Sequence, residues 1–120
     1  MPSKKFEILT PLSDIALANG RDVFTHYKKE STLDDQLLVA MEECGELVQA
    51  ITKLQRVAGD DNMTDKAKEN LASEIADVRI MLNQLTYMTG SDANVAEQIE
   101  YKLGRQRKRI EGNTCPVSGF

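Results

Sequence analysis

The positions of proline most constrain how this chain folds. Pro2, Pro11 and Pro116 all lie near the ends, so the whole stretch between Pro11 and Pro116 lacks the strongest helix breaker. Within that stretch the apolar residues recur at spacings of three and four, the period of an amphipathic helix, and not at two. The sequence therefore predicts a chain built from helices.

Capping residues and glycines divide this stretch into four predicted helices, over about 13–27, 32–57, 64–88 and 91–110. Thr32 is the expected N-terminal cap of the second helix, residues 59–62 form a loop, and Gly90 ends the third helix. Such helices assemble into an all-α, four-helix-type bundle with short connections. Residues 1–120 then make a single domain, with 1–11 and 112–120 expected to be flexible ends.

Charge and composition exclude several classes of function. The 15 Lys and Arg residues against 19 Asp and Glu residues give a net charge of −4, the wrong sign for binding the phosphate backbone of nucleic acids. No apolar run is long enough to span a bilayer, and 2 cysteines are too few for a secreted disulfide framework. We therefore expect a cytoplasmic protein that binds neither nucleic acid nor membrane.

The predicted helix 32–57 has a charged face and an apolar face. At about 100° per residue, Glu42, Glu43 and Glu46 fall on the charged side. Taken alone, that side is an ordinary solvated face. The opposite side is predicted to face the core, and its residues are Ala40, Met41, Cys44, Leu47, Val48, Ile51 and Leu54.

The predicted helix 64–88 breaks this simple pattern at Glu74. Glu74 falls inside the apolar stripe that runs from Leu71 to Met88, and Asp77 lies at its margin. Burying an unpaired carboxylate costs several kcal/mol, so Glu74 must be paired, protonated or bound to a metal. A buried salt bridge with Lys53 or an arginine is the alternative to a metal site.

Two acidic pairs favour the metal site. Glu43 with Glu46, and Glu74 with Asp77, are i, i+3 pairs, so each presents two carboxylates from one helix face. If the two helices pack antiparallel, four carboxylates surround one small volume and cannot all stay ionised without a cation. Oxygen ligands suit Mg²⁺, with Mn²⁺ as a substitute, whereas a di-iron site would want histidines and His26 is far away.

These residues resemble the signature of the MazG-like superfamily of all-α nucleoside triphosphate pyrophosphohydrolases. The family pattern is Glu-Glu-x-x-Glu on one helix and Glu-x-x-Asp on the next. Here Glu-Glu-Cys-Gly-Glu stands at 42–46 and Glu-Ile-Ala-Asp at 74–77. The likeness covers roughly residues 33–110.

The resemblance implies hydrolysis of a nucleoside triphosphate between its α and β phosphates, giving a monophosphate and pyrophosphate. It implies that Glu43, Glu46, Glu74 and Asp77 hold Mg²⁺. Glu42 would bind a further ion or orient the attacking water. Glu42 and Glu43 are the predicted catalytic residues. Carboxylates that position a metal, and not a Ser or Cys nucleophile, are what such chemistry needs.

Four more residues are candidate substrate contacts. Lys53 lies two turns beyond Glu46 and could reach a phosphate, or it is a surface lysine. Gln84 lies two turns after Asp77, where relatives often carry an amide. The resemblance implies that basic residues of the last helix, here Lys102 and Arg105, can face the triphosphate. The alternative is that these two cations only interact favourably with the dipole at the C-terminal end of the helix.

Members of this family are homodimers or pairs of dimers, so we expect a homo-oligomer assembled through helix packing, in which a neighbouring chain completes the base pocket. The nucleoside triphosphate could serve nucleotide-pool house-cleaning or precursor supply. One rival is a phosphoribosyl-ATP pyrophosphohydrolase. Another is a non-catalytic helical interaction module whose acidic cluster is structural.

Overall fold

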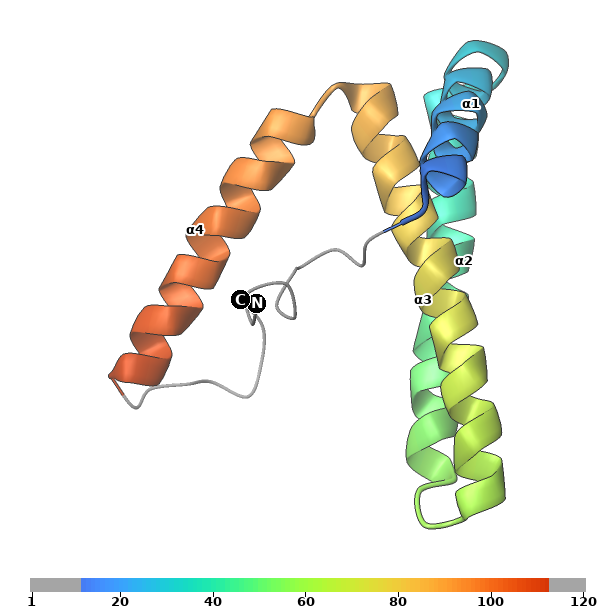
Figure 1. The fold of residues 1–120 in the computed structure, drawn as a ribbon, viewed down its shortest axis with the longest axis vertical. Coiled ribbons are helices and arrows are strands. Elements are labelled where there is room, and N and C mark those ends of the chain that lie inside the picture. The colour runs from blue at the N-terminus through green and yellow to red at the C-terminus, as the bar shows by residue number, and fades with distance from the viewer. Residues whose placement is uncertain (1–11, 113–120) are drawn as a thin grey trace.

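The computed structural model describes residues 12–112, and within them the chain forms helices and no strands. Four helices follow one another: α1 (Asp14–Glu30), α2 (Leu33–Arg56), α3 (Asp61–Thr89) and α4 (Asp92–Glu111) (Figure 1). The predicted all-α class is confirmed. The flexible ends predicted at 1–11 and 112–120 lie outside the described residues, except for Gly112, which is the C-terminal cap of α4.

Side-chain caps explain where the helices begin. The Ser13, Thr32 and Asp60 side chains each accept a hydrogen bond of 3.1 Å from the backbone N–H three residues later. Such caps satisfy N–H groups that have no partner within the helix. Asp60 starts α3 at Asp61, three residues before the predicted start at 64. Gly90, with φ of 64°, ends α3 as predicted.

The structure is organised around an antiparallel hairpin of α2 and α3, whose helices run side by side along their length (Figure 1). The buried apolar residues of the described chain lie on these two helices: Ala40, Ala50, Ala67, Val78 and Met81. Three of the five are alanines, which let two helix backbones approach closely. The apolar core between α2 and α3 is therefore small.

The predicted core face of α2 is partly wrong. Met41 is 62% exposed and Val48 is 61% exposed, and Cys44 is exposed as well, although all three were expected in the core. The face turned to α3 instead holds Gln36, Ala40, Glu43, Leu47, Ala50 and Leu54, all buried or half-buried. The helix carries two apolar stripes, and a single chain covers one of them.

The outer helices add little to this core. α1 packs along α3, whereas α4 meets α3 near the turn at Gly90 and then diverges from it (Figure 1). Neither α1 nor α4 has a buried residue. Val95, Ile99, Leu103 and Ile110 form an apolar stripe along α4, and all four are exposed. The predicted four helices are present, but α4 does not close a bundle within one chain.

Replacing Gly90 should destabilise the protein, while replacing Gly45 should not. A Cβ at either position meets no atom within 4 Å, so only backbone conformation differs: Gly90 has φ of 64°, and Gly45 is inside α2. We expect Gly90→Ala to lower the free energy of unfolding by about 1 kcal/mol, and Gly45→Ala to raise it by about 0.5–1 kcal/mol. Urea denaturation of both variants checks this, and equal effects would contradict it.

Candidate metal centre

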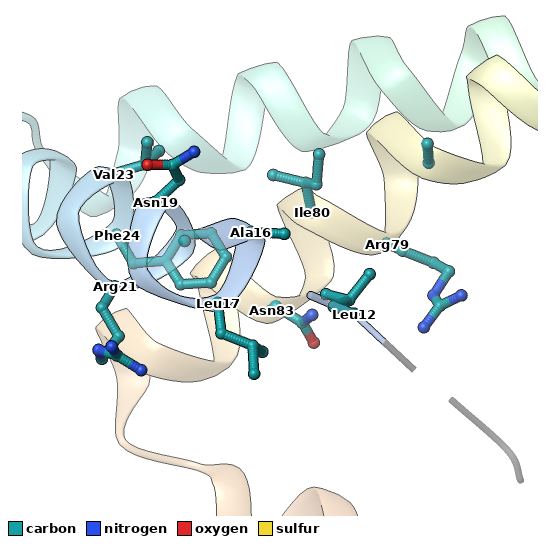
Figure 2. A pocket seen from close by; sticks show the side chains of 12 residues that line it. Leu12, Ala16, Leu17, Asn19, Arg21, Val23, Phe24, Arg79, Ile80 and Asn83 are labelled. Carbon is teal, nitrogen blue, oxygen red and sulfur yellow. The ribbon is translucent and has the colours of Figure 1, made fainter. Parts of the chain in front are cut away.

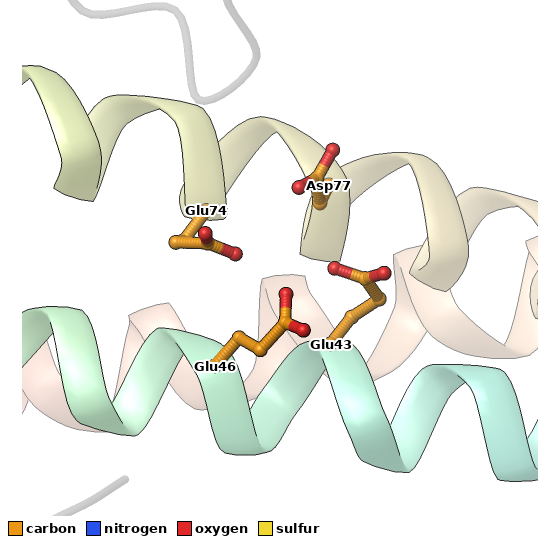
Figure 3. A group of neighbouring side chains, drawn as sticks. All are labelled: Glu43, Glu46, Glu74 and Asp77. Atoms are coloured by element: carbon orange, nitrogen blue, oxygen red, sulfur yellow. The ribbon is translucent and has the colours of Figure 1, made fainter.

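Four carboxylates converge between α2 and α3 (Figure 3). Glu43 and Glu46 come from α2, and Glu74 and Asp77 come from α3. One carboxylate oxygen from each residue can be chosen so that all four atoms lie within 4.8 Å of one another. The structure thus brings together the four residues that the sequence singled out as metal ligands.

The geometry of each helix and the register of the hairpin together bring the four carboxylates close to one another. Residues three apart lie on the same face of a helix, so each i, i+3 pair points to one side. The antiparallel register then sets Glu46 across from Glu74 and Glu43 across from Asp77 (Figure 3). Four negative groups occupy one short section of the α2–α3 interface.

The inner oxygens of this cluster lack partners. Glu43 and Glu74 are half-buried, and the Oε2 atom of each is covered by protein without any hydrogen-bond partner. Within residues 12–112 the structure records no ion pair between Glu74 and Lys53, the lysine expected in the salt-bridge alternative. A covered carboxylate oxygen without a donor costs free energy, so these two atoms are available for a cation.

The cluster disfavours its own ionisation. Burial raises the pKa of Glu43 above its ordinary 4.5, and the neighbouring charges of Glu46, Asp77, Glu74 and Glu42 raise it further. Burial also raises the pKa of Glu74, with added contributions from the charges of Glu46 and Asp77 and a hydrogen bond with the Glu46 carboxyl. Holding these acids together therefore lowers the stability of the folded chain when they are ionised. A bound cation would offset this unfavourable free energy.

The other predicted site residues lie at different distances from this cluster. Glu42 is exposed, and its charge acts on Glu43. Lys53 is exposed farther along α2. Lys102 and Arg105 lie on the second half of α4, which diverges from the hairpin (Figure 1), and the Arg105 guanidinium stands 5.5 Å from the Tyr101 ring centre. Their contact with a substrate at the carboxylates stays a prediction.

Gln84 is the largest fully buried side chain among the described residues, at 2% exposure. Its Nε2 donates a hydrogen bond to Oε1 of Gln36, which is 6% exposed. Sequence reasoning did not single out Gln36. The available signal was its place seven residues before Glu43, which mirrors the place of Gln84 seven residues after Asp77.

A cavity of about 630 Å³ lies on another side of α3, where α1 packs against it (Figure 2). Its walls are mostly apolar, with Leu17, Phe24 and Ile80 among them, and Arg21 and Asn83 add polar groups. None of the four carboxylates lines it. The cavity and the acidic cluster are therefore separate features of the fold.

Comparisons with known proteins add no relative to this description. No family model, curated protein or solved structure matches the chain. Within residues 12–112, none of the helices combines the length and the apolarity that crossing a membrane requires.

Without divalent cations, the carboxylate cluster should make the protein less stable as the pH rises. The folded-state pKa values of Glu43 and Glu74 exceed the ordinary 4.5, so the folded chain binds more protons than the unfolded chain above about pH 4.5. This contribution lowers the free energy of unfolding from about pH 4.5 up to the raised pKa values. Below that window the penalty is absent.

Thermal unfolding between about pH 4 and pH 8 in EDTA measures this contribution as the difference between variants. Glu74→Gln should gain stability over the unmodified chain as the pH rises. Glu69→Gln, an exposed position on the same helix outside the cluster, should show no such gain. A Glu74→Gln difference that stays constant or shrinks with rising pH would contradict the raised pKa.

Proposed function

We propose that this protein is a Mg²⁺-dependent nucleoside triphosphate pyrophosphohydrolase, which cleaves between the α and β phosphates to give a monophosphate and pyrophosphate. The observation that supports this proposal most strongly is the convergence of four carboxylates from two helices. One oxygen each from Glu43, Glu46, Glu74 and Asp77 lies within 4.8 Å of the others. The resemblance of 42–46 and 74–77 to the MazG-like signature supports this class of reaction.

The residues present fit a hard divalent cation. All four donors are carboxylates, and Mg²⁺ prefers oxygen ligands. Opposite ligands of Mg²⁺ stand about 4.2 Å apart, twice its usual ligand distance. The 4.8 Å spread of the four oxygens is close to that value. The covered Oε2 atoms of Glu43 and Glu74 have no hydrogen-bond partner in the protein, so they can serve as ligand atoms for the cation.

In this proposal the chain positions charge and water and forms no covalent intermediate. When bound, Mg²⁺ would neutralise phosphate oxygens and lower the pKa of a bound water. Glu42 is exposed beside Glu43, so its carboxylate can accept a hydrogen bond from the attacking water and take up its proton. Glu43, the other predicted catalytic residue, is one of the four proposed ligands of the cation.

The substrate contacts are proposed on the residues that surround this centre. Lys53 follows Glu46 by two turns of α2 and is exposed, so its ammonium can approach a phosphate. Gln84 follows Asp77 by two turns of α3, but it is 2% exposed and its Nε2 donates to Gln36, so we do not include it among the substrate contacts. Lys102 and Arg105 lie on α4, which diverges from the hairpin (Figure 1), so we assign their phosphate contacts to the assembled oligomer.

We propose that the protein is a homodimer or a tetramer formed through helix packing. The second apolar stripe of α2 and the stripe on α4 are both exposed, with Met41 62% and Ile110 60% exposed. A monomer rarely leaves long apolar helix faces in water, and a second copy carries matching faces. Burial between chains would also place α4 against a neighbouring hairpin.

Replacing Glu74 should strongly reduce the metal-dependent reaction without unfolding the protein. Glu74→Gln keeps the shape of the side chain but removes a charge from the cluster. We expect it to lose the rise in Tm that Mg²⁺ gives the unmodified chain. Pyrophosphate release should fall by about 100-fold or more, because removing even an indirect ligand partner costs about 10–100-fold. Glu69→Gln is the matched control and should keep both properties.

The assay for this prediction covers ribo- and deoxyribonucleoside triphosphates and phosphoribosyl-ATP, each with Mg²⁺ and with EDTA. Turnover of phosphoribosyl-ATP alone would identify the rival enzyme. Inorganic phosphate with a diphosphate would contradict cleavage between the α and β phosphates. No metal effect, together with strong destabilisation of Glu74→Gln, would make the acidic cluster structural.

An acidic side chain in the apolar stripe of α4 should break the oligomer. Ile99 is 39% exposed and lies in the middle of that stripe. Ile99→Asp should convert the oligomer to a monomer, because an unpaired charge would be buried at the helix contact. Gln98→Asp adds the same charge at the neighbouring exposed position and should leave the mass unchanged. Light scattering coupled to size-exclusion chromatography measures it, and a monomeric unmodified chain would refute the assembly.

A further inference from the structure

A chain of buried amide contacts joins three helices at one end of the hairpin. Gln84 of α3 donates from Nε2 to Oε1 of Gln36 on α2. Gln36 in turn donates from Nε2 to Oγ of Ser31, the residue that ends α1, at 2.8 Å. Both amides are buried, with Gln84 at 2% and Gln36 at 6% exposure. Each Gln36 amide atom therefore has a partner from a different helix.

This amide pair stands at a fixed place relative to the carboxylates. Seven residues along α2 from Gln36 lies Glu43, and seven residues back along α3 from Gln84 lies Asp77. Seven residues span about 10.5 Å of helix, two turns, and return to nearly the same face. The amide pair and the acidic pairs are thus successive layers of one interface between α2 and α3.

The opposite end of the hairpin has a polar contact of its own. There the Thr64 hydroxyl donates a 2.9 Å hydrogen bond to the carbonyl oxygen of Val57, across the short connection between α2 and α3. The connection holds the two helices together at that end. The Gln36–Gln84 pair lies at the other end, where no connecting loop joins α2 to α3. The carboxylates lie between these two contacts.

We propose that Gln36 and Gln84 are positioning residues that fix the rotation and spacing of α2 against α3, and thereby the distances among the four carboxylates. This inference rests on the metal centre proposed above. Repulsion among the acids pushes the helices apart, and the amide pair opposes that opening at the end where no loop does. Gln84 acts here through the helices and needs no substrate.

Buried amides suit this task better than apolar side chains. Two leucines can pack in several rotations of the helices at similar free energy, whereas a buried amide is satisfied in one arrangement. If either helix turns, a covered donor and acceptor lose their partners. A single polar residue in an apolar helix interface is known to select one register at some cost in stability.

The test separates metal affinity from stability in the full chain. The variants are Gln84→Leu, the double variant Gln36→Leu with Gln84→Leu, and Gln55→Leu as an exposed control on α2. Mn²⁺ alone is the probe, titrated by electron paramagnetic resonance. The single variant should lower Tm, because Gln36 loses a partner. The double variant should recover Tm but bind Mn²⁺ about tenfold more weakly, the effect of losing an outer support.

A distance measurement tests the same inference without any metal. Spin labels at the exposed positions 34 on α2 and 82 on α3, in a chain with Cys44→Ser and Cys115→Ser, report the spacing of the hairpin at its open end. We expect one narrow distance distribution for the unmodified pair and for Gln55→Leu. The double variant should give a broad or shifted distribution.

The two readouts distinguish failure of this inference from failure of the metal centre. A double variant with unchanged Mn²⁺ affinity and an unchanged distance distribution overturns the positioning role. If the unmodified chain binds no Mn²⁺, the metal centre fails, and the distance distribution alone then decides whether the amide pair holds the helices. A broadened distribution supports it, and an unchanged one overturns it.

Discussion

Four carboxylates that repel one another lie where α2 and α3 pack together. Glu43, Glu46, Glu74 and Asp77 face one another across the α2–α3 interface, and the pKa values of Glu43 and Glu74 rise because burial and neighbouring charge disfavour ionisation. A chain selected only for stability would place apolar side chains there. In the metal centre that we propose, a divalent cation would turn this mutual repulsion into shared attraction.

Few buried apolar side chains stabilise the hairpin that holds this cluster. Its buried apolar residues are few and small, with Ala40, Ala50 and Ala67 among them, so the helices approach closely but gain little from apolar burial. Polar contacts at both ends, Thr64 with Val57 and Gln84 with Gln36, then help set how the helices meet. In the oligomer that we propose, a second copy would cover the exposed stripes on α2 and α4, and this would link the stability of the site to assembly.

Much of this fold follows from local rules that a sequence displays. Thr32 and Gly90 set helix ends through their own chemistry, and Glu74 inside an apolar stripe already marks an unusual buried acid. The face of α2 that packs could not be predicted from periodicity, because this helix has two apolar stripes and Met41 and Val48 lie on the exposed one. The divergence of α4 could not be predicted either, because an apolar stripe does not indicate which surface covers it. Gln36 gave no signal alone, since a glutamine in a helix is ordinary until its partner is known.

The most direct test of the metal centre is anomalous diffraction from crystals of the full chain grown with Mn²⁺. We expect a manganese peak between α2 and α3, with oxygens from Glu43, Glu46, Glu74 and Asp77 at about 2.1 Å, near the ligand distance of hard divalent ions of this size. The same crystals grown with EDTA should lack the peak. Manganese bound elsewhere, or carboxylates that pair with basic side chains while the metal is present, would contradict the proposed metal centre.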